Sequence, residues 1–225
     1  MFDAVRERRL ARKVAGFDRP RHLGVLLDVP PPPDRVPASI TDLLAWCHEC
    51  GIEIVTLWLR PTASTQHRVV EMLATAVPDL LRRNAPYTPH FIDPAGLLPF
   101  VVAAPNGGRP IGRPVTIAIG YDGHDEVTQA VRAALAVHAK SGLTLGEAAD
   151  ALALDDITSH VYTSGYPDPD LIIRTSNRHR LDSFLLWQAA RSEFWFHRRR
   201  TSRFRKVDFL AALRDYGTRH RRYGA

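Results

Sequence analysis

Short apolar segments alternate with longer segments of helical periodicity along most of this 225-residue chain. This alternation predicts parallel strands joined by helices, because a parallel pair needs a long crossover between its strands. The strands are expected at Leu23–Leu27, Ile54–Leu59, Pro89–Ile92, Val115–Gly120 and Leu171–Arg174. The helices are expected at Pro37–Cys50, Gln66–Arg83, Asp125–Ser141, Thr144–Ala153, Ser183–Ser192 and Val207–Arg219. The sequence therefore predicts an α/β fold with a central, mostly parallel sheet flanked by helices.

The length of the chain suits one domain with a sizeable core, which we expect to cover residues 1–225. A basic amphipathic helix is expected in residues 1–19, with an apolar side formed by Phe2, Val5, Leu10 and Val14. No apolar run approaches the roughly 20 residues of a membrane-spanning helix, and the charged N-terminus has no apolar signal core. A cytoplasmic location is the resulting expectation.

The net charge of +6 is concentrated in the last third of the chain, for example in Arg198–Arg200. Such basicity suits nucleic acid, an anionic membrane surface or an anionic small substrate. No aromatic stacking platform or DNA-reading motif accompanies it, so nucleic acid is a distant alternative. Peripheral membrane contact stays open if the product is a lipid.

The two cysteines, Cys47 and Cys50, form one C-x-x-C motif. A structural zinc site wants about four ligands and the chain has no second pair, so we expect free thiols on a helix. Gly51 is expected to end that helix.

The loop after the last predicted strand carries four cationic or titratable residues, Arg174, Arg178, His179 and Arg180. Open α/β sheets bind ligands just beyond the carboxyl ends of their strands. Arginine holds two phosphate oxygens at once, and the N-terminus of the helix predicted after the loop would add its positive dipole end. This loop is therefore a candidate oxyanion site.

Within the same region, Pro167–Phe196 closely resembles the C-terminal signature of the cis-prenyltransferases, the undecaprenyl diphosphate synthase family. Weaker matches follow in the family's order at Pro20–Asp28, Gly51–Trp58, Val115–Glu126 and Val207–Gly224. The resemblance covers most of the chain. It implies an enzyme that condenses isopentenyl diphosphate with an allylic prenyl diphosphate.

The resemblance also implies roles for individual residues. Asp28 corresponds to the catalytic aspartate that holds Mg²⁺, and Glu193 to a second carboxylate near the metal. Arg174 and Arg180 correspond to the arginines that hold isopentenyl diphosphate, with His179 beside them.

The chain end carries a further implied site. Arg222 and Gly224 match a terminal Arg-x-Gly that reaches the diphosphate site of the neighbouring subunit. A homodimer is implied, or a heterodimer with a complete family member, with a helix around Phe184–Trp187 near the interface.

Three departures from the family pattern, together with a short tunnel segment, distinguish this chain. The family's Gly-Asn-Gly-Arg loop is replaced after Asp28 by Val29 and the four prolines Pro30–Pro33. Proline has no N–H and a fixed φ, so this run cannot cradle a phosphate; Arg35 is the candidate to replace part of the lost arginine. The polar turn after the second strand becomes Pro61–Ser64, and the tunnel-forming segment from Val69 to Pro99 is short.

The third departure is Asp182, which stands where the family usually has a diphosphate-binding serine. Its carboxylate would repel phosphate unless it meets a metal or pairs with Arg178.

One diphosphate site thus looks intact and the allylic site degenerate. The first interpretation is a divergent prenyltransferase using Mg²⁺. The second is an accessory subunit of a heteromeric cis-prenyltransferase that lends its Arg-x-Gly to a complete partner. The third is a terpene synthase or diphosphate lyase that acts on one prenyl diphosphate.

Overall fold

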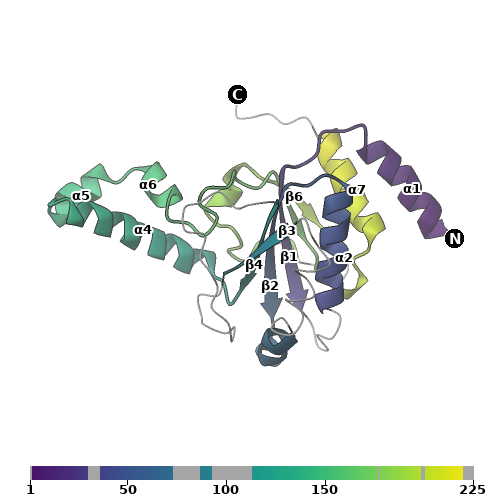
Figure 1. Ribbon diagram of the computed structural model, residues 1–225, viewed down its shortest axis with the longest axis horizontal. Helices are drawn as coiled ribbons and strands as arrows, with labels where there is room; N and C mark the ends of the chain where they lie inside the picture. Colours follow the sequence, from purple (N-terminus) through teal and green to yellow (C-terminus); the bar gives the residue numbers. More distant parts are fainter. Residues whose placement is uncertain are drawn as a thin grey trace.

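The computed structural model describes residues 2–29, 36–72, 87–92, 113–176, 178–198 and 201–219. One parallel sheet holds the six strands found in these ranges, in the order β3-β4-β2-β1-β5-β6 (Figure 1). The strands are β1 (His22–Val29), β2 (Ile54–Pro61), β3 (Tyr87–Ile92), β4 (Arg113–Ile119), β5 (Leu171–Arg174) and β6 (Glu193–Phe196). The predicted α/β fold class with a parallel sheet is confirmed.

Helices cover the sheet unevenly. Figure 1 shows α1 (Phe2–Val14), α2 (Val36–Glu49) and α7 (Lys206–Thr218) together on one side. In contrast, α4 (Gly123–Lys140), α5 (Leu145–Ala151) and α6 (Leu154–Thr158) extend away from the sheet. A helical segment also runs over residues 66–72, and two 3₁₀ turns lie at η1 (Gln188–Arg191) and η2 (Thr201–Arg203). None of the helices described is long and apolar enough to cross a bilayer.

Strand alternation divides the core into two clusters. Val25, Leu57 and Ile117 point to the face covered by α1, α2 and α7 and belong to the larger cluster. Leu26 and Trp58 point to the opposite face and belong to the smaller one. The central strands are apolar on both faces because both faces are covered.

Local signals placed several helix ends correctly. The Asp122 side chain accepts a hydrogen bond from the N–H of His124 and caps α4, while Thr144 and Glu147 form the capping box of α5. Gly51 has φ of 75° and follows α2, as expected of a helix-ending glycine. Cys47 is buried and Cys50 half-buried, and both thiols are free.

The predicted helix over Ser183–Ser192 is wrong. Asp182, Ser183 and Leu185 have φ angles of 47°, 65° and 50°, outside the right-handed helical region, and only the short turn η1 follows. The dipole expected from a helix directly after the loop is therefore absent, and no helix is present around Phe184–Trp187. The reason is packing, because the adjacent side chains of Phe184 and Leu185 are both buried in the smaller cluster.

Two smaller expectations also need correction. Val5 is 65% exposed, so the apolar side of α1 is formed by Leu10 and Val14. The sequence analysis missed the strand β6, whose four residues are only half-buried.

Candidate functional site at the carboxyl edge of the sheet

Three charged side chains meet at the carboxyl ends of neighbouring strands. Asp28 on β1 lies opposite Arg60 on β2, and Arg174 on β5 lies opposite Leu26, one pleat below Asp28. Side chains two residues apart on a strand share a face, so all three lie on the face of the smaller apolar cluster. The fold thus brings positions 28, 60 and 174 to one edge.

A fourth charged residue closes the group into a ring of ion pairs. Asp28 accepts from Arg60 Nε at 2.8 Å and from Arg174 Nη2 at 3.1 Å. Asp182, from the loop after β5, contacts the same Arg174 Nη2 at 2.9 Å and also pairs with Arg60. We call Asp28, Arg60, Arg174 and Asp182 the charged quartet.

The quartet is open on one side and closed on the other. Arg174 has a fully buried side chain, whereas Arg60 is 27% exposed and the carboxylates of Asp28 and Asp182 are 22% and 25% exposed. Arg174 Nε donates to Ser176 Oγ at 3.0 Å, while the buried Nη1 has no hydrogen-bond partner. An orphan donor on a buried guanidinium is costly, and functional sites are where such groups are found.

The local backbone explains how Asp182 reaches the quartet. Its positive φ turns the chain back toward β1, and the burial of Phe184 and Leu185 anchors the turn. Gly123 at the start of α4 touches the same turn, since a Cβ there would lie 2.0 Å from the carbonyl oxygen of Ser183. Partial desolvation would raise the pKa of Asp182, but Arg174 and Arg60 outweigh it and lower that pKa.

This geometry corrects the expectation for Asp182. Its partners are Arg174 and Arg60, not Arg178, which lies exposed on the polar loop. The departure from the serine pattern is therefore balanced by a cation from a different strand.

An aromatic and aliphatic surface continues from the quartet along the same face. Trp58, two residues before Arg60, stacks on Phe184 at 5.5 Å between ring centroids. Its edge also meets Tyr121 at 5.5 Å, and Leu26 lies in the same cluster. These side chains are buried, so an anionic group bound at the quartet would lie directly beside a part of the core from which water is excluded.

Two other predicted diphosphate ligands lie on the loop that follows β5. His179 and Arg180 are exposed, and the His179 ring packs edge-on against Phe196 at the end of β6. Arg222 and Gly224 lie outside the described residues, as do the proline run, Arg35 and most of the predicted tunnel segment.

Glu193 lies at the opposite edge of the sheet. It begins β6 level with Leu171 and Leu23, about 16 Å along the strands from Asp28. Its carboxylate pairs with Arg219 at the end of α7. Within one chain, Asp28 and Glu193 therefore do not share a metal ion.

The donor set of the quartet fits Mg²⁺. The Oδ2 atoms of Asp28 and Asp182 are no more than about 6 Å apart, because their contacts of 3.1 and 2.9 Å meet at one nitrogen. Mg²⁺ is commonly held by one or two carboxylates, with phosphate oxygens and water completing its shell. Over the described ranges no cluster of three or more His, Cys, Asp or Glu side chains could hold a metal.

Arg60 is the site residue that the sequence analysis missed. The second strand was predicted to end at Leu59, which left Arg60 outside the pattern. The two-residue period of a strand could have revealed Arg60. In an extended strand, an arginine two residues after Trp58 lies on the same face as Trp58.

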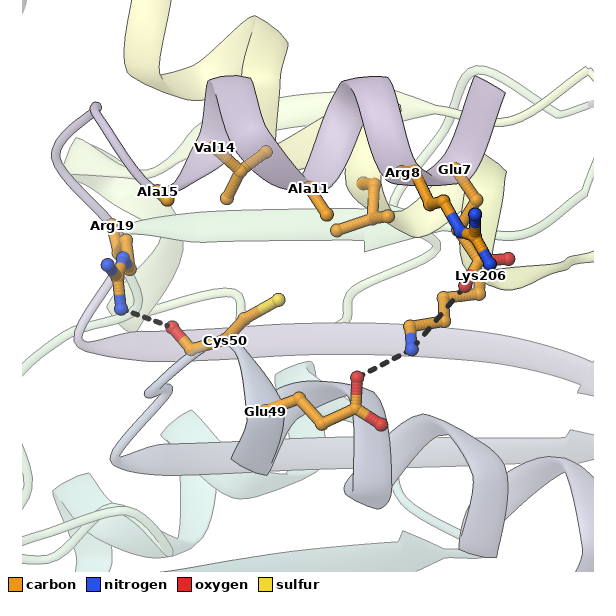
Figure 2. Close-up of a pocket in the computed structure, with 10 residues that line it drawn as sticks. Glu7, Arg8, Ala11, Val14, Ala15, Arg19, Glu49, Cys50 and Lys206 are labelled. Carbon is orange, nitrogen blue, oxygen red and sulfur yellow. Dashed lines mark hydrogen bonds and ion pairs between the residues drawn. The ribbon is translucent and has the colours of Figure 1, made fainter. Parts of the chain in front are cut away.

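A separate hollow of about 200 Å³ lies beneath α1, against α2 and α7 (Figure 2). Several of its polar groups already have partners, since Lys206 pairs with Glu7 and Glu49 and Arg19 donates to the carbonyl of Cys50. It holds no member of the quartet. We interpret it as the seam where α1 packs on its neighbours.

Comparison with known proteins gives a consistent result. The prenyltransferase family model, described as undecaprenyl diphosphate synthase, matches residues 110–224. A (2Z,6E)-farnesyl diphosphate synthase of Mycobacterium tuberculosis is 40% identical over 199 residues, which cover 83% of this chain and 76% of the relative. A (2Z,6E)-farnesyl diphosphate synthase of Thermobifida fusca is 40% identical over 242 residues, which cover 97% of this chain and 95% of the relative.

A solved structure supports the same fold. Lavandulyl diphosphate synthase from Lavandula x intermedia, crystallised with dimethylallyl diphosphate, superposes with a TM-score of 0.74. It covers 92% of this chain and 99% of its own, at 20% sequence identity. With a family model over half of its length and close relatives over most of it, the chain belongs to the undecaprenyl diphosphate synthase family, the cis-prenyltransferases.

Proposed function

We propose that this protein is a prenyltransferase that condenses isopentenyl diphosphate with an allylic prenyl diphosphate. The supporting observation is the charged quartet at the carboxyl edge, directly beside the buried apolar cluster of Leu26, Trp58 and Phe184. A prenyl diphosphate has the matching division into an anionic head and an apolar chain.

In the proposed reaction, the allylic C–O bond breaks and the diphosphate leaves with the electron pair. The double bond of isopentenyl diphosphate attacks the allylic carbon, and a proton is then lost from the adduct. Arg174 and Arg180 are proposed to hold the isopentenyl diphosphate through paired N–H groups. Trp58 and Phe184 would keep water away from the cationic carbon.

Mg²⁺ is the proposed cofactor, and when bound it would neutralise charge on the diphosphate oxygens. Asp28 is the residue proposed to hold it, with the Asp182 carboxylate near enough to contribute. Because Glu193 lies at the far edge of its own sheet, a role for it at a metal requires a second copy of the chain. The family resemblance gives the terminal Arg222 and Gly224 a role at the site of a neighbouring subunit as well.

A short product is the further proposal. Relatives over most of the chain are named (2Z,6E)-farnesyl diphosphate synthase or short-chain Z-isoprenyl diphosphate synthase. The match to an isoprenyl transferase of Streptomyces fradiae extends over 257 positions, more than the 225 residues of this chain. The relative therefore carries residues that this chain lacks, and we propose that some of them belong to the tunnel segment.

The test is an assay of the purified chain with Mg²⁺, isopentenyl diphosphate and primers of one, two or three isoprene units. We expect one main product, one or two units longer than its primer, and release of inorganic pyrophosphate. Hydrocarbon or alcohol from a single allylic diphosphate would favour the lyase alternative. Turnover only after addition of a complete family member would favour the accessory subunit, which the proline run after Asp28 makes the second candidate.

A further inference from the structure

We propose that Arg60 is a further diphosphate-binding residue, held by Asp28 and Asp182 until a magnesium-bound diphosphate takes their place. The inference rests on the proposed function, because it names a ligand group within that same site. It begins from the position of Arg60, at the carboxyl end of β2 and directly opposite Asp28.

Arg60 is the accessible cation of the quartet. Arg174 is fully buried beneath it, whereas 27% of the Arg60 side chain reaches solvent. An anion that approaches the carboxyl edge therefore meets Arg60 before Arg174. Both guanidinium groups lie against the same two carboxylates, so one diphosphate could contact both.

The charges favour an exchange of partners. Two guanidinium groups and two carboxylates leave the quartet with no net charge, so the empty site has no strong attraction for an anion. When Mg²⁺ engages Asp28 and Asp182, Arg60 loses its carboxylate partners and can donate to phosphate oxygens instead. Charge-assisted bonds to Asp28 Oδ1 and Asp182 Oδ2 are then replaced by equivalent bonds to the ligand.

Asp182 has a matching role as the internal counter-ion of Arg60. Its carboxylate binds Arg60 and Arg174 together, in the position that a phosphate oxygen would occupy. Neutralising Asp182 should therefore strengthen metal-free diphosphate binding, while neutralising Arg60 should weaken it. Opposite signs from two contacting residues are a specific signature of this exchange.

Calorimetric titration of the full chain with inorganic pyrophosphate tests the proposal, once with Mg²⁺ and once with a chelator. We expect Arg60→Gln to bind about tenfold more weakly with Mg²⁺ and by a smaller factor in the chelator, where Arg60 stays paired; Arg60→Lys should lie between it and the wild type. Asp182→Asn should bind several-fold more tightly in the chelator. Arg132→Gln, which changes an exposed arginine on α4, is the matched control and should leave affinity unchanged.

The results that would overturn the role of Arg60 differ from those that would reject the proposed prenyltransferase function. Unchanged affinity in Arg60→Gln would overturn the inference, as would a wild-type chain that does not bind pyrophosphate. A loss as large in the chelator as with Mg²⁺ would also overturn the exchange, because Arg60 would then be available to the anion without release from its carboxylate partners. If Arg60→Gln does not fold, a wild-type affinity in Arg60→Lys decides against the contact. Arginine-dependent pyrophosphate binding without condensation would instead reject the proposed function.

Discussion

The two ends of strand β1 carry polar side chains that the fold treats in opposite ways. At the amino end, His22 is fully buried, and its ring nitrogens meet the carbonyl of Pro167 at 2.6 Å and Thr56 Oγ1 at 2.9 Å. At the carboxyl end, Asp28 is partly exposed and bonds two guanidinium groups. Both ends pair with the same neighbour, β2, yet one is neutral and closed while the other is charged and open.

The difference separates a structural polar site from a functional one. Burial lowers the pKa of His22 to about 4, more than the Pro167 carbonyl and Asp170 raise it, so the ring is neutral near pH 7. Its partners belong to the fold and cannot be exchanged. The quartet instead consists of mutual ion pairs in which Asp28, Arg60 and Asp182 are reachable from solvent, and such pairs can be replaced by an ionic ligand.

The largest expected effect comes from removing the buried cation of the carboxyl end. Arg174→Ala should lower the free energy of unfolding by about 3 kcal/mol, because the ring of ion pairs loses its inner member. Condensation should fall by a factor on the order of 100 or more. Urea unfolding and initial rates measure the two effects, with Arg132→Ala as the exposed control. Near-wild-type values for Arg174→Ala would show that the quartet is incidental.

Gly123→Ala should lower the free energy of unfolding by about 2 kcal/mol, because the new Cβ would clash with the backbone of Ser183 and displace Asp182. Gly146→Ala, also in a helix but with open space around it, is the control and should be neutral or slightly stabilising. If the comparison holds, Gly123→Ala weakens pyrophosphate binding in the presence of Mg²⁺ and leaves the pH dependence due to His22 unchanged. Equal stability of the two variants would contradict the tight packing of the Asp182 turn.

The buried His22 at the amino end of β1 should make the free energy of unfolding about 2 kcal/mol lower at pH 5 than at pH 7.5. Unfolded His22 gains a proton below its usual pKa of about 6.5, whereas the folded ring stays neutral until about pH 4. Stability therefore falls as the pH falls through this window. His22→Asn should flatten that slope in urea titrations across the range. Exposed His67→Gln should keep it, and an unchanged slope in His22→Asn would place the sensitivity elsewhere.

The smallest effect is expected from Thr56→Val, which deprives His22 Nε2 of its partner and should cost about 1 kcal/mol. Adding His22→Phe should cost less in this background than in the wild type, because the two residues share one hydrogen bond. A double-mutant cycle by urea unfolding measures the coupling. Strictly additive losses would mean that the bond contributes nothing to stability.

Sequence patterns predicted the strands and helices that depend on local periodicity. Alternating apolar segments predicted five of the strands, and the capping residues Asp122 and Thr144 predicted two helix starts. The match to a family signature singled out Asp28 and Arg174, which the fold places in direct contact. The helix expected at Ser183–Ser192 failed because helical periodicity cannot reveal that Phe184 and Leu185 must both be buried.

The sequence by itself determined which residues share a face, since the two-residue period of a strand sets Trp58 beside Arg60 and Leu26 beside Asp28. Only the tertiary structure decided which faces meet. Arg60 and Asp182 are 122 positions apart, and their pairing depends on the strand order and on a turn with left-handed backbone angles. Local propensity does not predict contacts over such separations, because they depend on the packing of the whole sheet.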